Sequence, residues 1–325
     1  MRELIIVGAG PAGLSCSIYA SRFKIDHLII AKTLGGTLTE AHLVQNYPGI
    51  KEIKGQELAE KMVEHAKNYG VEIIQEEVTK LATQKHGSDR NTERFEIQTS
   101  NGQTYQTKTL FLGLGTRIRR LEVPGEKEFL GKGVAYCAAC DAPLFKDKTV
   151  AVIGGGNSAV TAALQLAEFC PKVYLINRGE TLRAEPFWQE QLQNTFTRLN
   201  ASAFGGQVIP NTSITEILGN DTVTKVKLDR KFEDKDELEV QGVFIEIGAV
   251  PAAALAKNLG AELTKNGLIK ITPDGKTSVP GVWAGGDVAT ACKDLEPRQI
   301  VHATSEGAMA ALSIFKHLRG TETKV

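Results

Sequence analysis

Two cysteines separated by two residues are the part of this chain best suited to chemistry. Cys137 and Cys140 stand in the stretch YCAACD. Thiols at this spacing can close a small disulfide that accepts an electron pair and passes it on. One glycine-rich nucleotide fingerprint precedes the pair, at Gly8, and a second follows it, at Gly154. This order predicts an electron relay between dinucleotide sites.

The alternatives for a C-x-x-C pair are half of a zinc site, a structural disulfide and two buried small residues. A structural zinc ion needs about four Cys or His ligands. The other cysteines, Cys16, Cys170 and Cys292, stand singly, and no histidine lies beside the pair. The sequence therefore favours redox chemistry and predicts no metal site.

The first fingerprint has the order expected of a dinucleotide site, with a strand, a tight turn and a helix. The apolar run 4–7 is the strand candidate and 15–22 the helix candidate. Glycines permit the turn, the approach of backbone to a pyrophosphate and close packing of the helix, whose positive end faces the phosphates. The fingerprint consists of Gly8, Gly10, Pro11, Ala12 and Gly13.

The next strand candidate, 26–32, distinguishes this first site from an ordinary NAD site. It ends in Ala31, Lys32 and Thr33. An ordinary NAD site has a carboxylate at this place, which hydrogen-bonds to the adenosine ribose. Residues 35–39 (GGTLT) can wrap a different cofactor with backbone groups. We expect this cofactor to be a flavin.

The second fingerprint lies at Gly154, Gly156, Asn157 and Ser158, before a helix candidate over 160–168. A strand over 172–176 follows, and residues at its end are expected to bind the adenosine ribose and any 2′-phosphate. Arg178 and Arg183 lie there, and guanidinium groups suit phosphate geometry. The alternative is an inherited scaffold whose nucleotide site is weak or vacant.

A third segment near the C-terminus also has cofactor character. Asp287, after a short strand and two glycines, can accept a hydrogen bond from a ribityl hydroxyl. A helix expected over 303–318 is preceded by 298–300, and its N-terminus can face the pyrimidine edge of a flavin and favour negative charge there.

Length and composition narrow the class of protein. The 325 residues are 42% hydrophobic, enough for about two domains. Lys plus Arg and Asp plus Glu number 38 each, so no basic field favours nucleic acid. The apolar run 4–7 is too short for a signal peptide or membrane span. We expect a cytoplasmic protein without a nucleic-acid or membrane partner.

Taken together, these motifs resemble those of the low-molecular-weight thioredoxin reductases, homodimeric flavoproteins, over nearly the whole chain. The resemblance implies an α/β fold of two Rossmann-like dinucleotide-binding domains, of three-layer ββα type, with the second inserted into the first. The FAD-binding domain would comprise 1–116 and 247–325, and the pyridine-nucleotide-type domain 117–246. The resemblance rests on Gly8 to Gly13, Gly36-Thr37, Asn46 to Gly49, Cys137/Cys140 with Asp141, Gly154 to Ala159, Gly285 to Asp287, and Arg298-Gln299.

The resemblance also implies roles for individual residues. Cys140 would face the flavin, Cys137 would attack the disulfide of a thioredoxin-like partner, and Asp141 would move the proton, because the attacking sulfur must be a thiolate. FAD would be held by residues of the N- and C-terminal segments: Gly8, Gly10, Pro11, Ala12, Gly13, Gly36, Thr37, Leu38, Asn46, Val78, Gly115, Gly286, Asp287, Arg298, Gln299 and Ile300.

The chain departs from the family at the predicted NADPH site. The family pattern H-R-R-x-x-x-R reads N-R-G-E-T-L-R here, over 177–183. Losing an arginine–phosphate contact of about 1.5–3 kcal/mol would weaken NADPH binding roughly ten- to over a hundredfold. The donor is therefore left open between NADPH, NADH and reduced ferredoxin.

A redox-sensing flavoprotein is the alternative from another class, which the intact Cys137, Cys140 and Asp141 disfavour. The same pair argues against the ferredoxin-NADP reductase branch of this architecture, which lacks a C-x-x-C.

Overall fold

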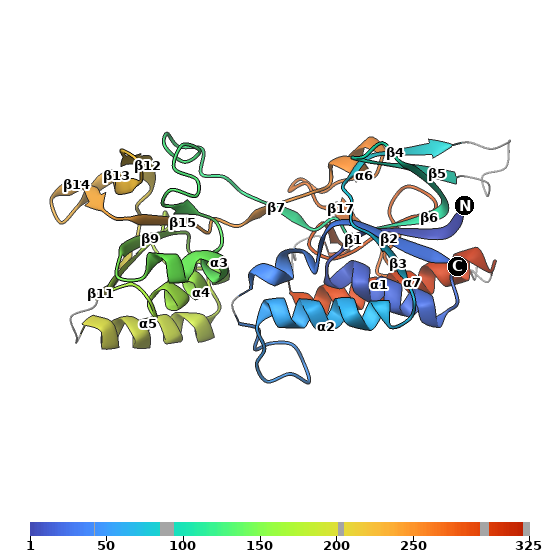
Figure 1. Cartoon of the computed structure of the whole chain (residues 1–325), viewed down its shortest axis with the longest axis horizontal. Coiled ribbons are helices and arrows are strands. Elements are labelled where there is room, and N and C mark those ends of the chain that lie inside the picture. Colours follow the sequence, from blue (N-terminus) through green and yellow to red (C-terminus); the bar gives the residue numbers. More distant parts are fainter. Residues whose placement is uncertain (42, 85–93, 201–204, 293–298, 321–325) are drawn as a thin grey trace. The chain divides into compact units, whose positions relative to one another are not determined.

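The structure is a computed structural model that describes residues 1–41, 43–84, 94–200, 205–292 and 299–320. The chain forms two compact units (Figure 1). The first unit comprises Met1–Arg117 and Val250–Val325, and the second comprises Ile118–Ala249.

The first unit is built on a seven-stranded sheet with the order β3-β2-β1-β6-β5-β4, in which β18 also pairs with β6. Strands β3, β2, β1, β6 and β18 run parallel, whereas β4, β5 and β6 form an antiparallel meander. The elements of this unit are β1 (Arg2–Ala9), α1 (Pro11–Arg22), β2 (His27–Leu34), η1 (Gly36–Glu40), α2 (Gly55–Lys67), β3 (Glu72–Ile74), β4 (Val78–Gln84), β5 (Arg94–Thr99), β6 (Thr104–Leu112), α6 (Ala254–Asn258), β17 (Ile269–Lys270), β18 (Val282–Ala284), β19 (Ala289–Thr290) and α7 (Ile300–Leu318). Two short strands, β7 (Thr116–Ile118) and β16 (Ala249–Pro251), span the boundaries between the two units.

Strand β1 is buried on both faces, which explains its continuous apolar sequence. Leu4 and Ile6 pack with the apolar sides of α1, α2 and α7, which lie along one face of the sheet in Figure 1. Ile5 and Val7 point to the opposite face, where they pack with β4, β5 and α6. The parallel part of the sheet is therefore the middle of three layers, with helices on one face and the strands β4 and β5 together with α6 on the other.

Strand β2 ends later than the sequence indicates. It extends to Leu34, which pairs with Ala9 after a register shift that follows the Val7–Ile30 pair. The next N–H, of Gly35, donates to the carbonyl of Ala9 over 2.8 Å. This bond holds the start of η1 beside the first glycine-rich turn.

The second unit contains a five-stranded parallel sheet with the order β11-β10-β9-β15-β8 and a three-stranded antiparallel sheet with the order β12-β13-β14. Its elements are β8 (Val134–Ala135), α3 (Ala138–Asp141), η3 (Ala142–Phe145), β9 (Thr149–Ile153), α4 (Asn157–Leu166), β10 (Lys172–Ile176), α5 (Pro186–Asn200), β11 (Gly205–Ile209), β12 (Ile214–Gly219), β13 (Val223–Phe232), β14 (Lys235–Glu239) and β15 (Gly242–Ile245).

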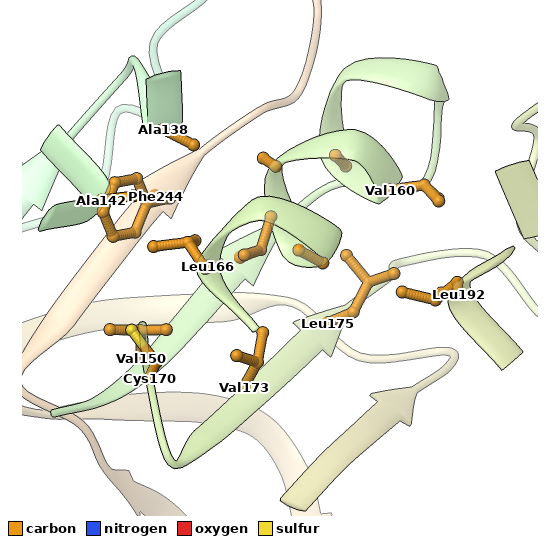
Figure 2. Close-up of a cluster of buried hydrophobic side chains, with 14 of the residues drawn as sticks. Ala138, Ala142, Val150, Val160, Leu166, Cys170, Val173, Leu175, Leu192 and Phe244 are labelled. Atoms are coloured by element: carbon orange, nitrogen blue, oxygen red, sulfur yellow. The ribbon is translucent and has the colours of Figure 1, made fainter. Parts of the chain in front are cut away.

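Alternate residues of β9 serve the two faces of this parallel sheet. Val150 and Val152 pack with α3, α4 and α5. Figure 2 shows part of this cluster, with Val150 labelled. Ala151 and Ile153 pack against β12, β13 and β14. The unit therefore has three layers, helices on one face of the parallel sheet and a small antiparallel sheet on the other. The predicted fold class, α/β with Rossmann-like sheets of ββα type, is confirmed.

The chain crosses between the units twice, at adjacent strands. Strands β7 and β16 form a two-stranded sheet. Glycines flank it, with Gly115 at φ +60° and Gly248 at φ +90°. Among the helices of the described residues, none is long and apolar enough to cross a membrane.

The contact between α1 and α7 depends on a glycine. A Cβ atom built on Gly307 would lie 2.1 Å from the carbonyl oxygen of Ala12 and 3.0 Å from the backbone nitrogen of Cys16. Gly307→Ala should lower the free energy of unfolding by about 1–3 kcal/mol through overpacking, although alanine has the higher helix propensity. Urea unfolding followed by circular dichroism measures this, with exposed Ser305→Ala on the same helix as the control. A Gly307→Ala protein as stable as the wild type would contradict the close helix packing.

Candidate active site

The redox turn lies between β8 and η3. Cys137 and Cys140 form a disulfide with a Cα–Cα distance of 5.3 Å. Cys137 is the N-cap of the short helix α3, and its sulfur accepts a hydrogen bond from the N–H of Cys140 over 3.1 Å. The N–H of Asp141 donates to the carbonyl of Cys137, also over 3.1 Å. The predicted redox centre is thus held in a single helical turn.

The three residues of this turn differ in exposure. Cys140 is exposed, whereas Cys137 and Asp141 are half-buried. Burial raises the pKa of the Asp141 carboxyl above its usual value, because a low-dielectric environment disfavours the charged form. The raised pKa lies closer to neutral pH, where the carboxyl group can both release and accept a proton.

Glu126 supports this turn, and sequence reasoning missed it. The residue is 1% exposed, and its carboxylate accepts the N–H of Leu121 over 2.9 Å and that of Glu122 over 2.6 Å. It also accepts the hydroxyl of Tyr136 over 2.5 Å. Tyr136 directly precedes Cys137, so one carboxylate joins the beginning of the second unit to the redox turn. A buried glutamate with three donors 4 to 10 residues away has no short-range sequence signal.

The first glycine-rich turn fits a pyrophosphate group. A Cβ atom on Gly13 would lie 1.9 Å from the carbonyl oxygen of Gly8, so α1 packs against the turn more closely than any side chain permits. Gly10 is the N-cap of α1 and no side chain caps the helix. A Cβ atom on Gly10 would meet nothing within 4 Å. The turn therefore presents open space at a helix N-terminus, where anions are favoured.

The other predicted FAD residues approach this turn from distant parts of the chain. A Cβ atom on Gly36 would lie 3.1 Å from the Cα of Gly10, and one on Gly286 would lie 3.0 Å from the Cβ of Ala12. Asp287 follows Gly286, Thr37 is exposed, and Pro11 is the first residue of α1. The structure thus brings the first fingerprint, η1 and the segment after β18 together.

Asn46 and Gln299 are 253 residues apart, yet the Asn46 amide donates to the Gln299 side-chain oxygen over 2.9 Å. Gln299 is the N-cap of α7, which begins at Ile300. Leu38 and Val78 are buried within η1 and β4, and Gly115 lies next to the crossing strand β7. Arg298 lies outside the described residues.

Glu306 of α7 is a second residue that sequence reasoning missed. Its carboxylate accepts the N–H of Gly286 over 2.6 Å and contacts Nε2 of His302 over 2.9 Å. Burial raises its pKa. Glu306 therefore holds the turn before Asp287 against α7.

The second glycine-rich turn is bordered by the loop after β10. Gly156 is the N-cap of α4, no side chain caps this helix, and a Cβ atom on Gly156 would meet nothing within 4 Å. Asn177 is buried, and its amide donates to the carbonyls of Gly179 and Thr181, each over 2.9 Å. The predicted nucleotide residues Ser158, Arg178 and Arg183 are exposed. Arg178 and Arg183 form no ion pair with another described residue.

Comparison with known proteins assigns the family. A family model described as pyridine nucleotide-disulphide oxidoreductase matches residues 2–307. The chain belongs to this family. Thioredoxin reductase of Bacillus subtilis (strain 168) is 33% identical over 322 residues, covering 96% of this chain and 93% of that protein. The crystal structure of T. acidophilum thioredoxin reductase is similar, with a TM-score of 0.86 and 35% identity over 98% of this chain and 99% of that one.

The family resemblance drawn from the motifs is thereby confirmed. Another relative of this oxidoreductase is NADH dehydrogenase of Bacillus subtilis (strain 168), 35% identical over 317 residues. The match covers 97% of this chain and 58% of that protein. The chain thus spans little more than half the length of this relative.

The Glu126 contacts predict how stability depends on pH. Burial would raise the pKa of Glu126, but the Tyr136 hydroxyl and two backbone N–H groups outweigh it, and the pKa lies below its usual value. The stabilisation is therefore complete above the unfolded-state pKa of about 4.3 and is lost as the pH falls through the lower folded-state pKa.

Glu126→Gln should lower the free energy of unfolding at pH 7 by about 1.5–3 kcal/mol, the range for hydrogen bonds to a charged group. The difference from the wild type should shrink as the pH falls below about 4. Urea unfolding between pH 3 and pH 8 measures both effects, with exposed Glu128→Gln as the control. If the difference in unfolding free energy between Glu126→Gln and the wild type stays constant from pH 3 to pH 8, the loss of stability comes from altered packing and not from the lost charge.

Proposed function

We propose that this protein is an FAD-dependent disulfide oxidoreductase that reduces a thioredoxin-like protein through Cys137 and Cys140. The observation that carries the proposal is the Cys137–Cys140 disulfide, which the structure forms in one turn with Asp141. The exposure of Cys140 and the presence of two dinucleotide-type turns favour a redox-active disulfide rather than a purely structural one. We further propose a cytoplasmic homodimer with no nucleic-acid or membrane partner.

The chemistry of the reduced pair follows from the two sulfurs. The Cys137 thiolate attacks the partner disulfide and forms a mixed disulfide, releasing one partner thiolate. The Cys140 thiolate then attacks the Cys137 sulfur, which re-forms the Cys137–Cys140 bond and releases the reduced partner. Two electrons pass to the partner. Asp141, whose pKa burial raises, holds and delivers a proton for the leaving thiolates.

Bound FAD would supply the electron pair that reduces the Cys137–Cys140 disulfide. The open N-terminus of α1 at Gly10 would hold its pyrophosphate, with Gly36 and Gly286 beside it. Asp287 and the beginning of α7 would hold the remaining part of the FAD molecule.

The second unit would bind a pyridine nucleotide through the turn at Gly154 to Ser158, with Arg178 and Arg183 toward a 2′-phosphate. Asn177 binds carbonyls of its own loop, and Gly179 stands where the family pattern has arginine. These features support weakened NADPH use, and reduced ferredoxin is the second candidate donor.

The relay requires Cys140. Cys140→Ser should leave FAD bound but abolish reduction of thioredoxin, because the mixed disulfide cannot be resolved and the internal disulfide cannot form. The flavin absorbance spectrum and a thioredoxin-coupled assay measure these two properties. Cys292→Ser, which removes an exposed free thiol, should behave as the wild type. Reduction of thioredoxin by the Cys140→Ser variant would contradict the proposed relay.

The altered phosphate loop offers a gain-of-function test. A Cβ atom on Gly179 would meet only ordinary contacts at 3.6 Å and beyond, so a larger side chain fits. Gly179→Arg should therefore tighten NADPH binding about tenfold, the effect of about 1.4 kcal/mol, and leave NADH unchanged. Anaerobic bleaching of the flavin by each nucleotide measures this, with Gly179→Ala as the control.

Reduced ferredoxin belongs in the same experiment. If NADPH bleaches neither the wild type nor Gly179→Arg while ferredoxin bleaches both, the electron path does not use the second fingerprint.

A further inference from the structure

The loop that closes the second nucleotide turn carries a carboxylate at its end. The N–H groups of Arg183 and Ala184 both donate to the carbonyl of Gly155, over 2.6 and 3.1 Å. The next residue is Glu185, which precedes α5. Backbone hydrogen bonds therefore fix the position of Glu185 relative to the glycine-rich turn.

Glu185 and Asn157 are joined by two reciprocal hydrogen bonds. The Asn157 amide nitrogen donates to Oε1 of Glu185 over 2.9 Å, and the Glu185 N–H donates to Oδ1 of Asn157 over 2.7 Å. Asn157 is the first residue of α4 and a predicted nucleotide residue. Both polar atoms of its side chain are thus bound by Glu185, and a negative charge lies beside the N-terminus of α4.

This arrangement opposes the group that the turn is shaped to bind. A dinucleotide places its pyrophosphate at the helix N-terminus, where the N–H groups and the helix dipole favour an anion. The negative charge of the Glu185 carboxylate would partly cancel the positive potential at the N-terminus of α4, and it would repel the phosphates of a bound dinucleotide. Like charges a few ångströms apart repel each other, and the repulsion grows as the local dielectric constant falls.

We propose that Glu185 is an affinity-tuning residue, which lowers the affinity of the second unit for every pyrophosphate-containing nucleotide. The inference rests on the proposed function of this turn as a nucleotide site. It differs from recognition of the 2′-phosphate by Arg178 and Arg183, because every dinucleotide carries the pyrophosphate. Glu185 should therefore weaken nucleotides with and without a 2′-phosphate by the same factor.

Binding of NADP⁺ and NAD⁺ to the FAD-loaded full chain tests this by calorimetry, since neither probe reduces the flavin. Glu185→Gln keeps an oxygen that can accept from Asn157 and removes the charge. It should bind both probes about three- to tenfold more tightly at low salt, and the gain should shrink at about 1 M salt, where the screening length is about 3 Å. The ratio of the two affinities should stay unchanged.

Asp221→Asn is the matched control, because it removes one exposed negative charge from the turn between β12 and β13 of the same unit. Equal or weaker binding by Glu185→Gln, or a gain that salt does not reduce, would overturn the role of Glu185. So would an absence of binding in both proteins. Reductive titration of the flavin and disulfide with dithionite is independent of the second turn, so it reports separately on whether the proposed relay holds.

Discussion

The approach of a helix to the end of its preceding strand is the constraint on which both candidate nucleotide sites depend. In the first unit the carbonyl of Gly8 occupies the place of a side chain on Gly13. In the second unit a Cβ atom on Gly154 would lie 2.9 Å from the Cβ of Ala159 in α4. These contacts exclude side chains at Gly13 and Gly154, and the glycines at the N-caps, Gly10 and Gly156, leave the N-termini of α1 and α4 uncapped. The geometry that packs each helix is therefore the geometry that makes it able to hold a phosphate.

The redox turn uses two carboxyl groups in contrasting environments. Asp141 is half-buried, and burial raises its pKa. Glu126 is more deeply buried, yet three donors hold its pKa below the usual value. Burial and then the contact with Glu126 raise the pKa of Tyr136 to about 12, so the phenol remains a donor. A carboxylate that stays charged can support the turn, while one that gains a proton more readily is suited to proton transfer.

The sequence predicted those features that depend on short-range pattern. Strand β10 has the predicted bounds, 172–176, and α7 begins three residues before the predicted 303, because apolar periodicity does not mark a helix start that lacks a capping side chain. Contacts over long separations were beyond such reasoning. The pairs Asn46–Gln299 and Gly286–Glu306 depend on which strands become neighbours, and the family resemblance, not spacing, selected Asn46 and Gln299. The roles of the individual site residues stay predictions.

The two nucleotide turns differ in what surrounds them, and this difference bears on how each could work. Around the first turn the neighbours are small and mostly apolar: a Cβ atom on Gly36 would lie 3.1 Å from the Cα of Gly10, and one on Gly286 would lie 3.0 Å from the Cβ of Ala12. Such a cradle matches a cofactor that is bound once and retained. Around Gly156 the border is polar, with the Asn157–Glu185 pair and a loop held by the Asn177 amide. Hydrogen bonds to water can replace these contacts at little net cost, so this border suits a donor that must arrive, react and leave in each cycle. Since a relay needs one retained cofactor and one exchanging donor, the contrast between the turns supports the order of sites along the proposed electron path.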